Sequence, residues 1–314
     1  MPVGLGLSTS HAPSMFQPAE RWPDLHRILV GDTPQPPAVA EETPEVLAQY
    51  VERVNTAFAT LEQVLVAYQP DALILVGDDQ NEVFSKAIEP QMAIFLGGDV
   101  SGTTSLRLLG ESLTENHIKL RCHTELAGHL IRGLVARGFD VCPMYELQAM
   151  SRPEGGLGHA FTRPSRALHV DDHEIPVVVF FLNAYHEPLP TAKRCLELGR
   201  AISEVLADRP ERVAILGSGG LSHDPRGPRA GWIDQQLDRW ILSTIESGHP
   251  SQLQQLFTVG SDTFHGGTGE VRSWIVTAAA LDGVKATVVD YLAAHHAVTG
   301  LGFAYWSQDQ SVRP

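Results

Sequence analysis

The chain has 314 residues, 43% of them apolar, which is enough to bury the core of one large domain or two modest ones and argues against a disordered protein. Its 23 Lys and Arg residues against 37 Asp and Glu residues give a net charge of −14, which disfavours binding to the phosphate backbone of nucleic acids. No run approaches the roughly 18 apolar residues that a membrane span requires, so we expect neither a nucleic acid nor a membrane as partner.

Two further features bear on the compartment in which the protein works. The N-terminal residues, MPVGLGLSTSHAP, carry no basic segment and reach His11 and Pro13 too early for a secretory signal. The three cysteines, Cys122, Cys142 and Cys195, are odd in number and widely spaced, so they predict neither a disulfide framework nor a zinc knuckle. We therefore expect a cytoplasmic protein with reduced cysteines.

Strand-like and helix-like stretches alternate along the chain. Apolar residues alternate at 3–7 and form continuous runs further on, and both patterns predict strands. Thr43-Pro44-Glu45 is typical of a helix start, and apolar residues continue at helical spacing to about Tyr68. The predicted strands are residues 3–7, 71–76, 92–96, 139–142, 177–182, 213–216 and, as the last strand, 286–291. The predicted helices are residues 43–68, 123–137, 190–207, 231–247, 250–257 and 270–281.

Three segments show no clear period. Residues 14–42 are rich in proline and aromatic residues, residues 97–105 are rich in glycine, serine and threonine, and a glycine- and aromatic-rich tail follows residue 291. No internal repeat and no low-complexity linker divides the chain. We therefore predict the α/β class, with a single catalytic domain over residues 1–314 and a central, mostly buried sheet flanked by helices.

Four of the predicted strands end in a polar or glycine-rich cluster, and three of these clusters contain a histidine. The histidines are His11, His186 and His223, and the fourth cluster is Asp78-Asp79-Gln80. A single histidine at a strand end is usually structural or solvated, but several that converge are unusual. In open α/β sheets, ligands bind outside the carboxyl ends of the strands, so we expect these groups to surround one site.

Several familiar catalytic patterns do not occur. Gly217-Ser218-Gly219-Gly220 is rich in glycine but fits neither the dinucleotide-binding nor the Walker pattern. No GxSxG elbow surrounds Ser218 or Ser222, there is no HExxH, and no cysteine lies in a nucleophile signature. These observations disfavour nucleotide binding, serine hydrolysis of that type and thiol catalysis.

Five motifs, taken together and in their order, resemble one family. They are Ser10-His11-Ala12-Pro13, Gly77-Asp78-Asp79-Gln80, Gly217-Ser-Gly-Gly-Leu-Ser-His223, Gly267-Thr-Gly-Glu270-Val-Arg-Ser-Trp274 and Gly300-Leu-Gly-Phe-Ala-Tyr-Trp306. In this combination the chain is similar to the class III extradiol ring-cleaving dioxygenases, the superfamily of the protocatechuate 4,5-dioxygenase catalytic subunit. Within that superfamily it resembles the gallate and 3-O-methylgallate dioxygenase branch. The resemblance extends from about residue 3 to residue 306.

The resemblance implies a non-haem Fe(II) enzyme that opens an aromatic ring with O2. His11 matches the first histidine ligand of the iron, and Glu270 matches its carboxylate ligand. His223 matches the acid–base histidine, and His159 is similar to a second active-site histidine that contacts substrate or dioxygen. A site of two histidines and one carboxylate leaves positions open for the catechol oxygens and O2, while a further histidine moves the catechol proton.

One position departs from the family pattern. Many members have a second histidine ligand after the second strand, where this chain has Asp79-Gln80. Gln80 could coordinate through its amide oxygen, or Asp79 or Asp78 could take its place, which would make a harder site that suits Mn(II) or Mg(II) better than Fe(II). In the third alternative no metal binds, and hydrogen bonds among His11, Gln80 and Glu270 close the pocket.

We expect an anionic aromatic substrate in spite of the net charge, because local donors rather than the global charge hold a carboxylate. The candidate donors are the backbone N–H groups of the loop that contains Ser218, Gly219 and Gly220, and the side chains of Arg163 and Arg226. Glycine at 219 and 220 permits a positive φ and a close approach of a ligand to the main-chain N–H groups.

Three functions follow from these patterns. The first is an extradiol dioxygenase that acts on a carboxylated catechol or gallate-type aromatic with O2. The second is a metal-free or hydrolytic enzyme with His159 and His223 as its acid–base pair, and the third is a non-catalytic subunit. The presence of His11, His223 and Glu270 together argues against the third, since a purely structural subunit needs none of them. We further expect a homodimer.

Overall fold

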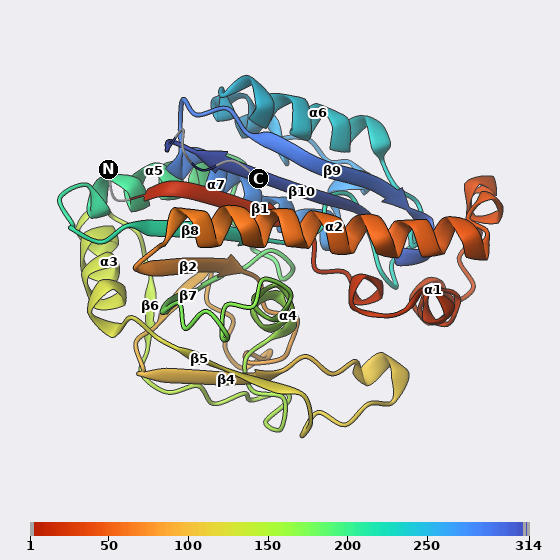
Figure 1. The fold of residues 1–314 in the computed structure, drawn as a ribbon, viewed down its shortest axis with the longest axis horizontal. Helices are drawn as coiled ribbons and strands as arrows, with labels where there is room; N and C mark the ends of the chain where they lie inside the picture. The colour runs from red at the N-terminus through yellow and green to blue at the C-terminus, as the bar shows by residue number, and fades with distance from the viewer. Residues whose placement is uncertain (1–2, 310–311, 313–314) are drawn as a thin grey trace.

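The computed structural model describes residues 3–309 and 312, and its mixed α/β architecture confirms the predicted fold class (Figure 1). One sheet contains the strands β1 (Val3–Thr9), β2 (Ala72–Gly77), β3 (Met92–Phe95), β6 (Cys142–Met144), β7 (Val177–Leu182), β8 (Val213–Ser218), β9 (Thr287–Ala294) and β10 (Thr299–Ser307). Their order is β6-β3-β7-β2-β8-β1-β10-β9. The neighbours β7, β2, β8 and β1 run parallel, so their carboxyl ends meet at one edge of the sheet.

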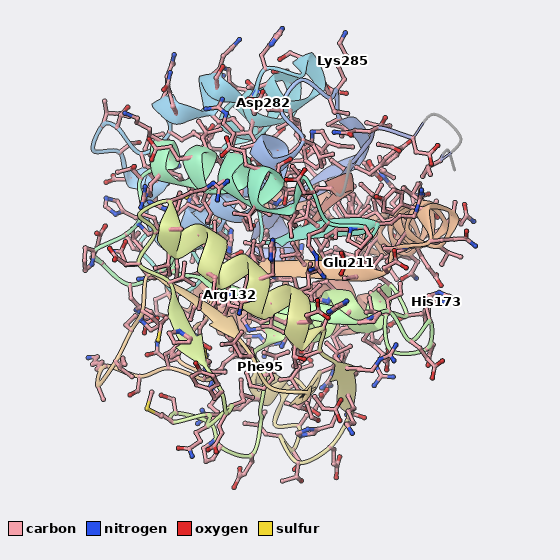
Figure 2. The ribbon with its side chains drawn as sticks, turned by 90° about the vertical axis from the view of Figure 1, so that its left-hand side faces the viewer. Phe95, Arg132, His173, Glu211, Asp282 and Lys285 are labelled. Atoms are coloured by element: carbon pink, nitrogen blue, oxygen red, sulfur yellow. The ribbon has the colours of Figure 1, made fainter. Side chains whose placement is uncertain are left out.

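Helices cover both faces of this sheet. α3 (Thr124–Ala136), α5 (Ala192–Leu206), α6 (Gln235–Ser247) and α7 (Val271–Ala280) contribute to the core on one face, and α2 (Pro44–Tyr68) and α4 (His159–Ala167) to the core on the other. Figure 2 looks along the strands from the side of their amino ends, with α3 and α5 toward the viewer and Arg132 of α3 exposed. Burial on both faces explains the continuous apolar runs: in β2, Ile74 joins one core and Leu73 the other.

Most predicted elements are present. α2 begins where the sequence indicates, with the Thr43 hydroxyl accepting a hydrogen bond from the N–H of Val46 at 3.4 Å. The strand at 177–182 has its predicted bounds. Bounds differ by no more than two residues for the predicted strands at 3–7, 71–76, 92–96 and 213–216 and the predicted helices at 123–137, 190–207 and 270–281.

The two aperiodic segments in the first half of the chain contain regular structure that the sequence did not indicate. Within 14–42, Trp22–Val30 forms α1, which has Pro23 in its first turn. Within 97–105, β4 (Asp99–Thr103) pairs with β5 (His117–Arg121) in a separate two-stranded sheet. Both strands have exposed residues between buried ones, so their apolar signal is weaker than that of the fully buried central strands.

Three further predictions were wrong in their bounds or type. The helix predicted at 250–257 is a 3-10 turn at Pro250–Gln255, and α6 begins at Gln235 rather than at 231. The strand predicted at 139–142 lies at Cys142–Met144. α4 was not predicted, because Pro164 inside it interrupts the helical pattern.

The tail that follows residue 291 is not irregular. Thr299–Ser307 forms β10, which pairs antiparallel with β1 and β9 inside the sheet, so the strand at 286–291 is not the last one. Gly300 and Gly302 weaken the strand signal but are needed for close contacts. A Cβ on Gly300 would lie 2.1 Å from a carboxylate oxygen of Asp238, and one on Gly302 would lie 3.0 Å from the Trp274 ring.

The three cysteines, Cys122, Cys142 and Cys195, are free thiols, as their spacing predicted. Among the helices of the described residues, none has both the length and the apolar character that crossing a membrane requires.

Candidate active site

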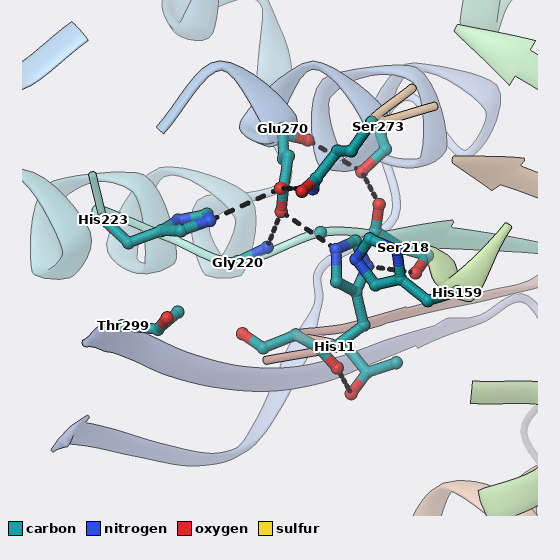
Figure 3. A network of polar contacts seen from close by, with 12 residues as sticks. His11, His159, Ser218, Gly220, His223, Glu270, Ser273 and Thr299 are labelled. Atoms are coloured by element: carbon teal, nitrogen blue, oxygen red, sulfur yellow. Dashed lines mark hydrogen bonds and ion pairs between the residues drawn. The ribbon is translucent and has the colours of Figure 1, made fainter. Parts of the chain in front are cut away.

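The loops that follow β1, β2 and β8 meet at the carboxyl edge of the sheet. His11 follows β1, Gln80 follows β2 and His223 follows β8. Glu270 ends a short 3-10 turn that leads directly into α7. As expected for two residues of one site, His11 and Glu270 lie side by side, with His11 Nε2 3.4 Å from Glu270 Oε2 (Figure 3).

Glu270 is the centre of the polar network in Figure 3. Its side chain is 1% exposed; Oε2 accepts a hydrogen bond from the N–H of Gly220 at 2.7 Å, and Oε1 accepts one from the Gln80 amide at 2.9 Å. His223 Nε2 lies 3.4 Å from Oε1. Burial by itself would raise the pKa of Glu270, but the imidazoles of His11 and His223 hold it well below its usual range. The carboxylate is therefore ionised.

His11 uses one ring nitrogen to hold its orientation and turns the other toward Glu270. Nδ1 is hydrogen-bonded to the Ser218 hydroxyl at 2.8 Å. Nε2 is buried and has no hydrogen-bond partner. We expected Ser218 to contact substrate, but the structure places its hydroxyl against His11, where it orients the imidazole.

The two aspartates after β2 point in different directions. The Asp79 carboxylate accepts hydrogen bonds from the N–H groups of Glu82, Val83 and Phe84 at 3.2, 2.9 and 3.1 Å, so it stabilises its own loop. Both Asp78 oxygens are buried and have no hydrogen-bond partner within residues 3–309 and 312. Of the acidic alternatives that the sequence left open, the structure thus turns Asp78 rather than Asp79 toward the site.

Three potential ligands therefore converge. The ligand atoms of His11, Asp78 and Glu270 all lie within 4.8 Å of one another. Burial and the charge of Glu270 raise the pKa of Asp78 well above its usual range. Buried polar atoms without partners are costly, and a divalent cation would satisfy both His11 Nε2 and Asp78. These residues fit a metal, but as one histidine and two carboxylates rather than the two histidines and one carboxylate of the family pattern.

His223 stands beside this cluster. Its Nδ1 donates a hydrogen bond to the Leu221 carbonyl at 3.0 Å, which leaves Nε2 turned toward Glu270. A Cβ on Gly267 would lie 1.9 Å from Nε2, so only glycine permits this approach. Burial by itself would lower the pKa of His223, but the charge and hydrogen bond of Glu270 raise it. Gly219 and Gly220 are not among the described residues with positive φ; a Cβ on Gly220 would meet the His223 ring at 2.6 Å.

Glu82 is a site residue that the sequence analysis missed. Its two oxygens each lie 2.9 Å from Nδ1 of His159, which opens α4. Burial would raise the pKa of Glu82, but His159 and then Arg152 and Arg163 lower it to about 2, so it accepts the Nδ1 proton. Burial lowers the pKa of His159 itself. No local pattern relates residues 82 and 159, so a single sequence carries no signal for this pair.

A cavity of about 500 Å³ opens over the cluster, and its lining includes His159, His223 and four arginines. The arginines are Arg107, Arg152, Arg163 and Arg226. Arg152 lies 3.3 Å from Glu82. Arg163 is 7% exposed, and among the residues that the structure describes it makes no hydrogen bond or ion pair and has a buried Nε without a partner. Burial lowers the pKa of Arg163 to about 10. Both arginines that the sequence nominated, Arg163 and Arg226, thus line the cavity.

We had expected the backbone N–H groups of the loop after β8 to bind the substrate, but in the structure they donate to other parts of the protein. The N–H of Gly219 donates to the Thr9 carbonyl at 3.0 Å, and that of Gly220 donates to Glu270. The N–H of Leu221 donates to the Gly300 carbonyl at 3.0 Å. This loop therefore positions Glu270, and the arginines that line the cavity remain as candidate donors for a carboxylate.

The third histidine at a strand end does not join the site. His186 Nε2 lies 3.1 Å from the Asn81 amide and does not line the cavity. Its neighbour Tyr185 does line the cavity, as does Thr299 at the start of β10, and the sequence analysis named neither. The backbone turn after a strand decides which of two adjacent side chains faces the cavity, and residue type alone does not reveal that turn.

Comparisons with known proteins relate the chain to aromatic ring-cleaving dioxygenases. The family model for the catalytic LigB subunit of aromatic ring-opening dioxygenase matches residues 33–304. The chain is 28% identical over 200 residues to the 2,3-dihydroxyphenylpropionate/2,3-dihydroxicinnamic acid 1,2-dioxygenase of Photorhabdus laumondii, a match that covers 64% of this chain and 57% of the relative. The protein of the same name from Klebsiella pneumoniae is 26% identical over 230 residues, which cover 73% of this chain and 64% of the relative.

The chain therefore spans less than two thirds of the length of these curated relatives. The crystal structure of an uncharacterized protein from Escherichia coli K12 covers 96% of this chain and 99% of its own, with 12% identity and a TM-score of 0.49. That similarity is too low to support an argument.

Proposed function

The chain belongs to the family of the catalytic LigB subunit of aromatic ring-opening dioxygenases, and we propose that it is an extradiol dioxygenase that opens a carboxylated catechol or gallate-type aromatic with O2. One observation carries the proposal: the buried, partly unsatisfied cluster of His11, Asp78 and Glu270 beside a cavity that two further histidines line. The names of the two relatives, both ring-cleaving dioxygenases for a dihydroxyphenyl acid, agree with this substrate class.

We assign a non-haem Fe(II) to His11, Asp78 and Glu270. When bound, the metal would orient the diol and O2 next to each other and supply the redox chemistry of ring opening. Gln80 then acts as an outer partner, because its amide holds Glu270 Oε1 at 2.9 Å. Two carboxylates make this site harder than two histidines and one carboxylate would, so Mn(II) is the alternative metal.

The two histidines around the cavity have the arrangement needed to move protons of the diol. His159 donates from Nδ1 to Glu82, which leaves Nε2 able to accept a proton. His223 donates from Nδ1 to the Leu221 carbonyl, so its exchangeable position is also Nε2. We propose that His159 contacts the substrate and that His223 is the principal acid–base residue, returning a proton to the opened ring.

The proposal is tested with protein purified without oxygen and loaded with Fe(II) or Mn(II). We expect metal-dependent O2 uptake and formation of a ring-opened product with at least one of 3,4-dihydroxybenzoate, gallate and 2,3-dihydroxyphenylpropionate. Controls are the protein treated with chelator and the same protein reloaded with Mg(II), which has no accessible redox change. No turnover of any of the three diols by either loaded form would refute the dioxygenase assignment.

Arg163 is proposed to hold the substrate carboxylate, because it is the cavity arginine that is buried and without a hydrogen bond or ion pair among the described residues. Arg163→Gln is expected to raise the KM for a carboxylated catechol by about 10–100-fold, the worth of a charge-assisted hydrogen bond, while the KM for unsubstituted catechol changes little. Steady-state kinetics on both substrates measure this selectivity.

The matched control for Arg163 is Arg166→Gln, one turn further along α4. Arg166 is exposed and lies outside this cavity, so its removal should leave both KM values unchanged. An equal rise of KM for catechol and its carboxylated analogue in Arg163→Gln would contradict the proposed role.

A second candidate function has one observation in its favour. The Gln80 amide donates to Glu270, as a metal-free pocket closed by its own hydrogen bonds requires. The closure is incomplete, however, since His11 Nε2 and both oxygens of Asp78 have no hydrogen-bond partner. Native turnover that survives complete chelation would establish this metal-free, acid–base function with His159 and His223, and turnover strictly dependent on Fe(II) would eliminate it.

The assembly and location of the protein complete the proposal. We propose a single catalytic domain over residues 1–314, working in the cytoplasm as a homodimer. Neither a nucleic acid nor a membrane is proposed as a partner, since the net charge is −14 and no long apolar run occurs.

A further inference from the structure

Tyr185 is a polar residue of the cavity that belongs neither to the metal cluster nor to the histidine and arginine groups already described. Tyr185 follows β7, the neighbour of β2 in the sheet, and lines the cavity together with Gln80 and Glu270. Its Oη is buried and has no hydrogen-bond partner in the described part of the chain. Buried tyrosine hydroxyls usually have a hydrogen-bond partner, because transferring an unpaired hydroxyl from water to the protein interior costs free energy.

The backbone around Tyr185 is held from two sides. The Asn183 side chain accepts hydrogen bonds from the N–H groups of Tyr185 and His186 at 3.2 and 3.0 Å and donates one to the His186 carbonyl at 2.6 Å. On the other side, Gly269 approaches the Ala184 carbonyl so closely that a Cβ would lie 2.1 Å from its oxygen. The phenol is therefore placed in advance rather than free to find a partner elsewhere.

The surroundings of Tyr185 keep its hydroxyl protonated. Burial raises the pKa of Tyr185 well above its usual value, and the charges of Glu270 and Asp78 raise it further. Neither of these carboxylates accepts a hydrogen bond from Oη. The site thus contains a neutral O–H donor, close to the proposed metal ligands, whose acceptor is not supplied by the protein.

We propose that Tyr185 is a substrate-contacting residue, whose Oη donates a hydrogen bond to an oxygen of the aromatic diol. The inference rests on the proposed function and adds to it a residue outside the five sequence motifs. A diol oxygen that loses its proton becomes a stronger acceptor, so this hydrogen bond favours the ionised substrate over the neutral one. Tyr185 supplies a donor at the diol, just as Arg163 supplies one for the carboxylate.

The test uses the Fe(II)-loaded full chain without oxygen and 4-nitrocatechol as the probe. The visible absorption of this diol changes when its hydroxyls ionise, so one titration reports both affinity and ionisation state. Tyr185→Phe keeps the ring and removes only the hydroxyl. We expect it to weaken probe binding by about 10–100-fold and to shift ionisation of the bound probe to higher pH. Iron content should equal that of the wild type, and the unfolding midpoint should be no lower.

The control variant is Tyr68→Phe, which removes a hydroxyl that does have partners. Tyr68 Oη accepts a hydrogen bond from the N–H of Gly4 at 3.2 Å and donates one to the Val213 carbonyl at 3.4 Å, at the amino end of β1 and β8. Its loss should lower the unfolding midpoint and leave the affinity for 4-nitrocatechol unchanged. Tyr185→Phe is therefore expected to change the affinity for the probe, and Tyr68→Phe the unfolding midpoint.

Each outcome decides the matter. Equal affinity of the wild type and Tyr185→Phe for 4-nitrocatechol would overturn the role of Tyr185 and leave the dioxygenase proposal standing. A parallel loss of iron from Tyr185→Phe would also overturn it, because Tyr185 would then act through the metal ligands. If the Fe(II)-loaded wild type bound neither 4-nitrocatechol nor 3,4-dihydroxybenzoate, the proposed function would fail, and this inference with it.

Discussion

Replacing Asp78 by asparagine is expected to abolish tight binding of Fe(II) and, with it, turnover. Loss of an outer-shell partner costs about 10–100-fold in metal affinity, so loss of a ligand carboxylate should cost more than that. The metal-free protein should tolerate the change. Burial and Glu270 raise the pKa of Asp78 well above its usual range, which favours the protonated acid over the carboxylate, and asparagine resembles the protonated acid in shape and charge. Metal titration by calorimetry and urea unfolding of the metal-free form measure the two effects separately.

The neighbouring residue provides the matched control. Asp79→Asn removes the charge that accepts three backbone N–H groups, so it should destabilise the protein by about 1–2 kcal/mol. Its metal affinity should stay within a few-fold of the wild type. The opposite pattern, with metal binding lost in Asp79→Asn and kept in Asp78→Asn, would show that the loop rearranges around the metal and that Asp79 is the ligand.

Replacing His223 by alanine is expected to lower kcat by about 10²–10⁴-fold, the usual contribution of a positioned acid–base group. Metal content should be retained, because His223 Nε2 lies 3.4 Å from Glu270 and is not one of the three groups that converge as ligands. Single-turnover rates and metal analysis of the same preparation measure both quantities.

The control for His223 is His129→Ala, which removes an imidazole from α3 that is hydrogen-bonded to the Val205 carbonyl at 3.0 Å. The kcat of His129→Ala should stay within about twofold of the wild type, since His129 does not line the cavity. A loss of metal from His223→Ala as large as its loss of kcat would reassign His223 as a ligand.

The sequence by itself was sufficient for the central strands and for the motif residues. Continuous apolar runs such as 177–182 are long enough to require burial on both faces, and this requirement is independent of what packs against them. The parallel strands then bring their carboxyl ends to one edge, so His11, Gln80 and His223 had to come close once the sheet formed. Glu270 was identified through its motif, and the structure confirms that it lies beside His11.

Tertiary structure alone decided which of two adjacent polar residues faces the site. Asp78 and Asp79 are chemically identical, and Tyr185 and His186 are both plausible site residues; in each pair the backbone turn after the strand selects one. Tertiary structure also decided the role of Glu82, which depends on its contact with His159 at the start of α4, a residue far away in sequence. Residue type and local spacing encode burial and backbone conformation, whereas the direction of a side chain in a loop depends on contacts with elements far away in sequence.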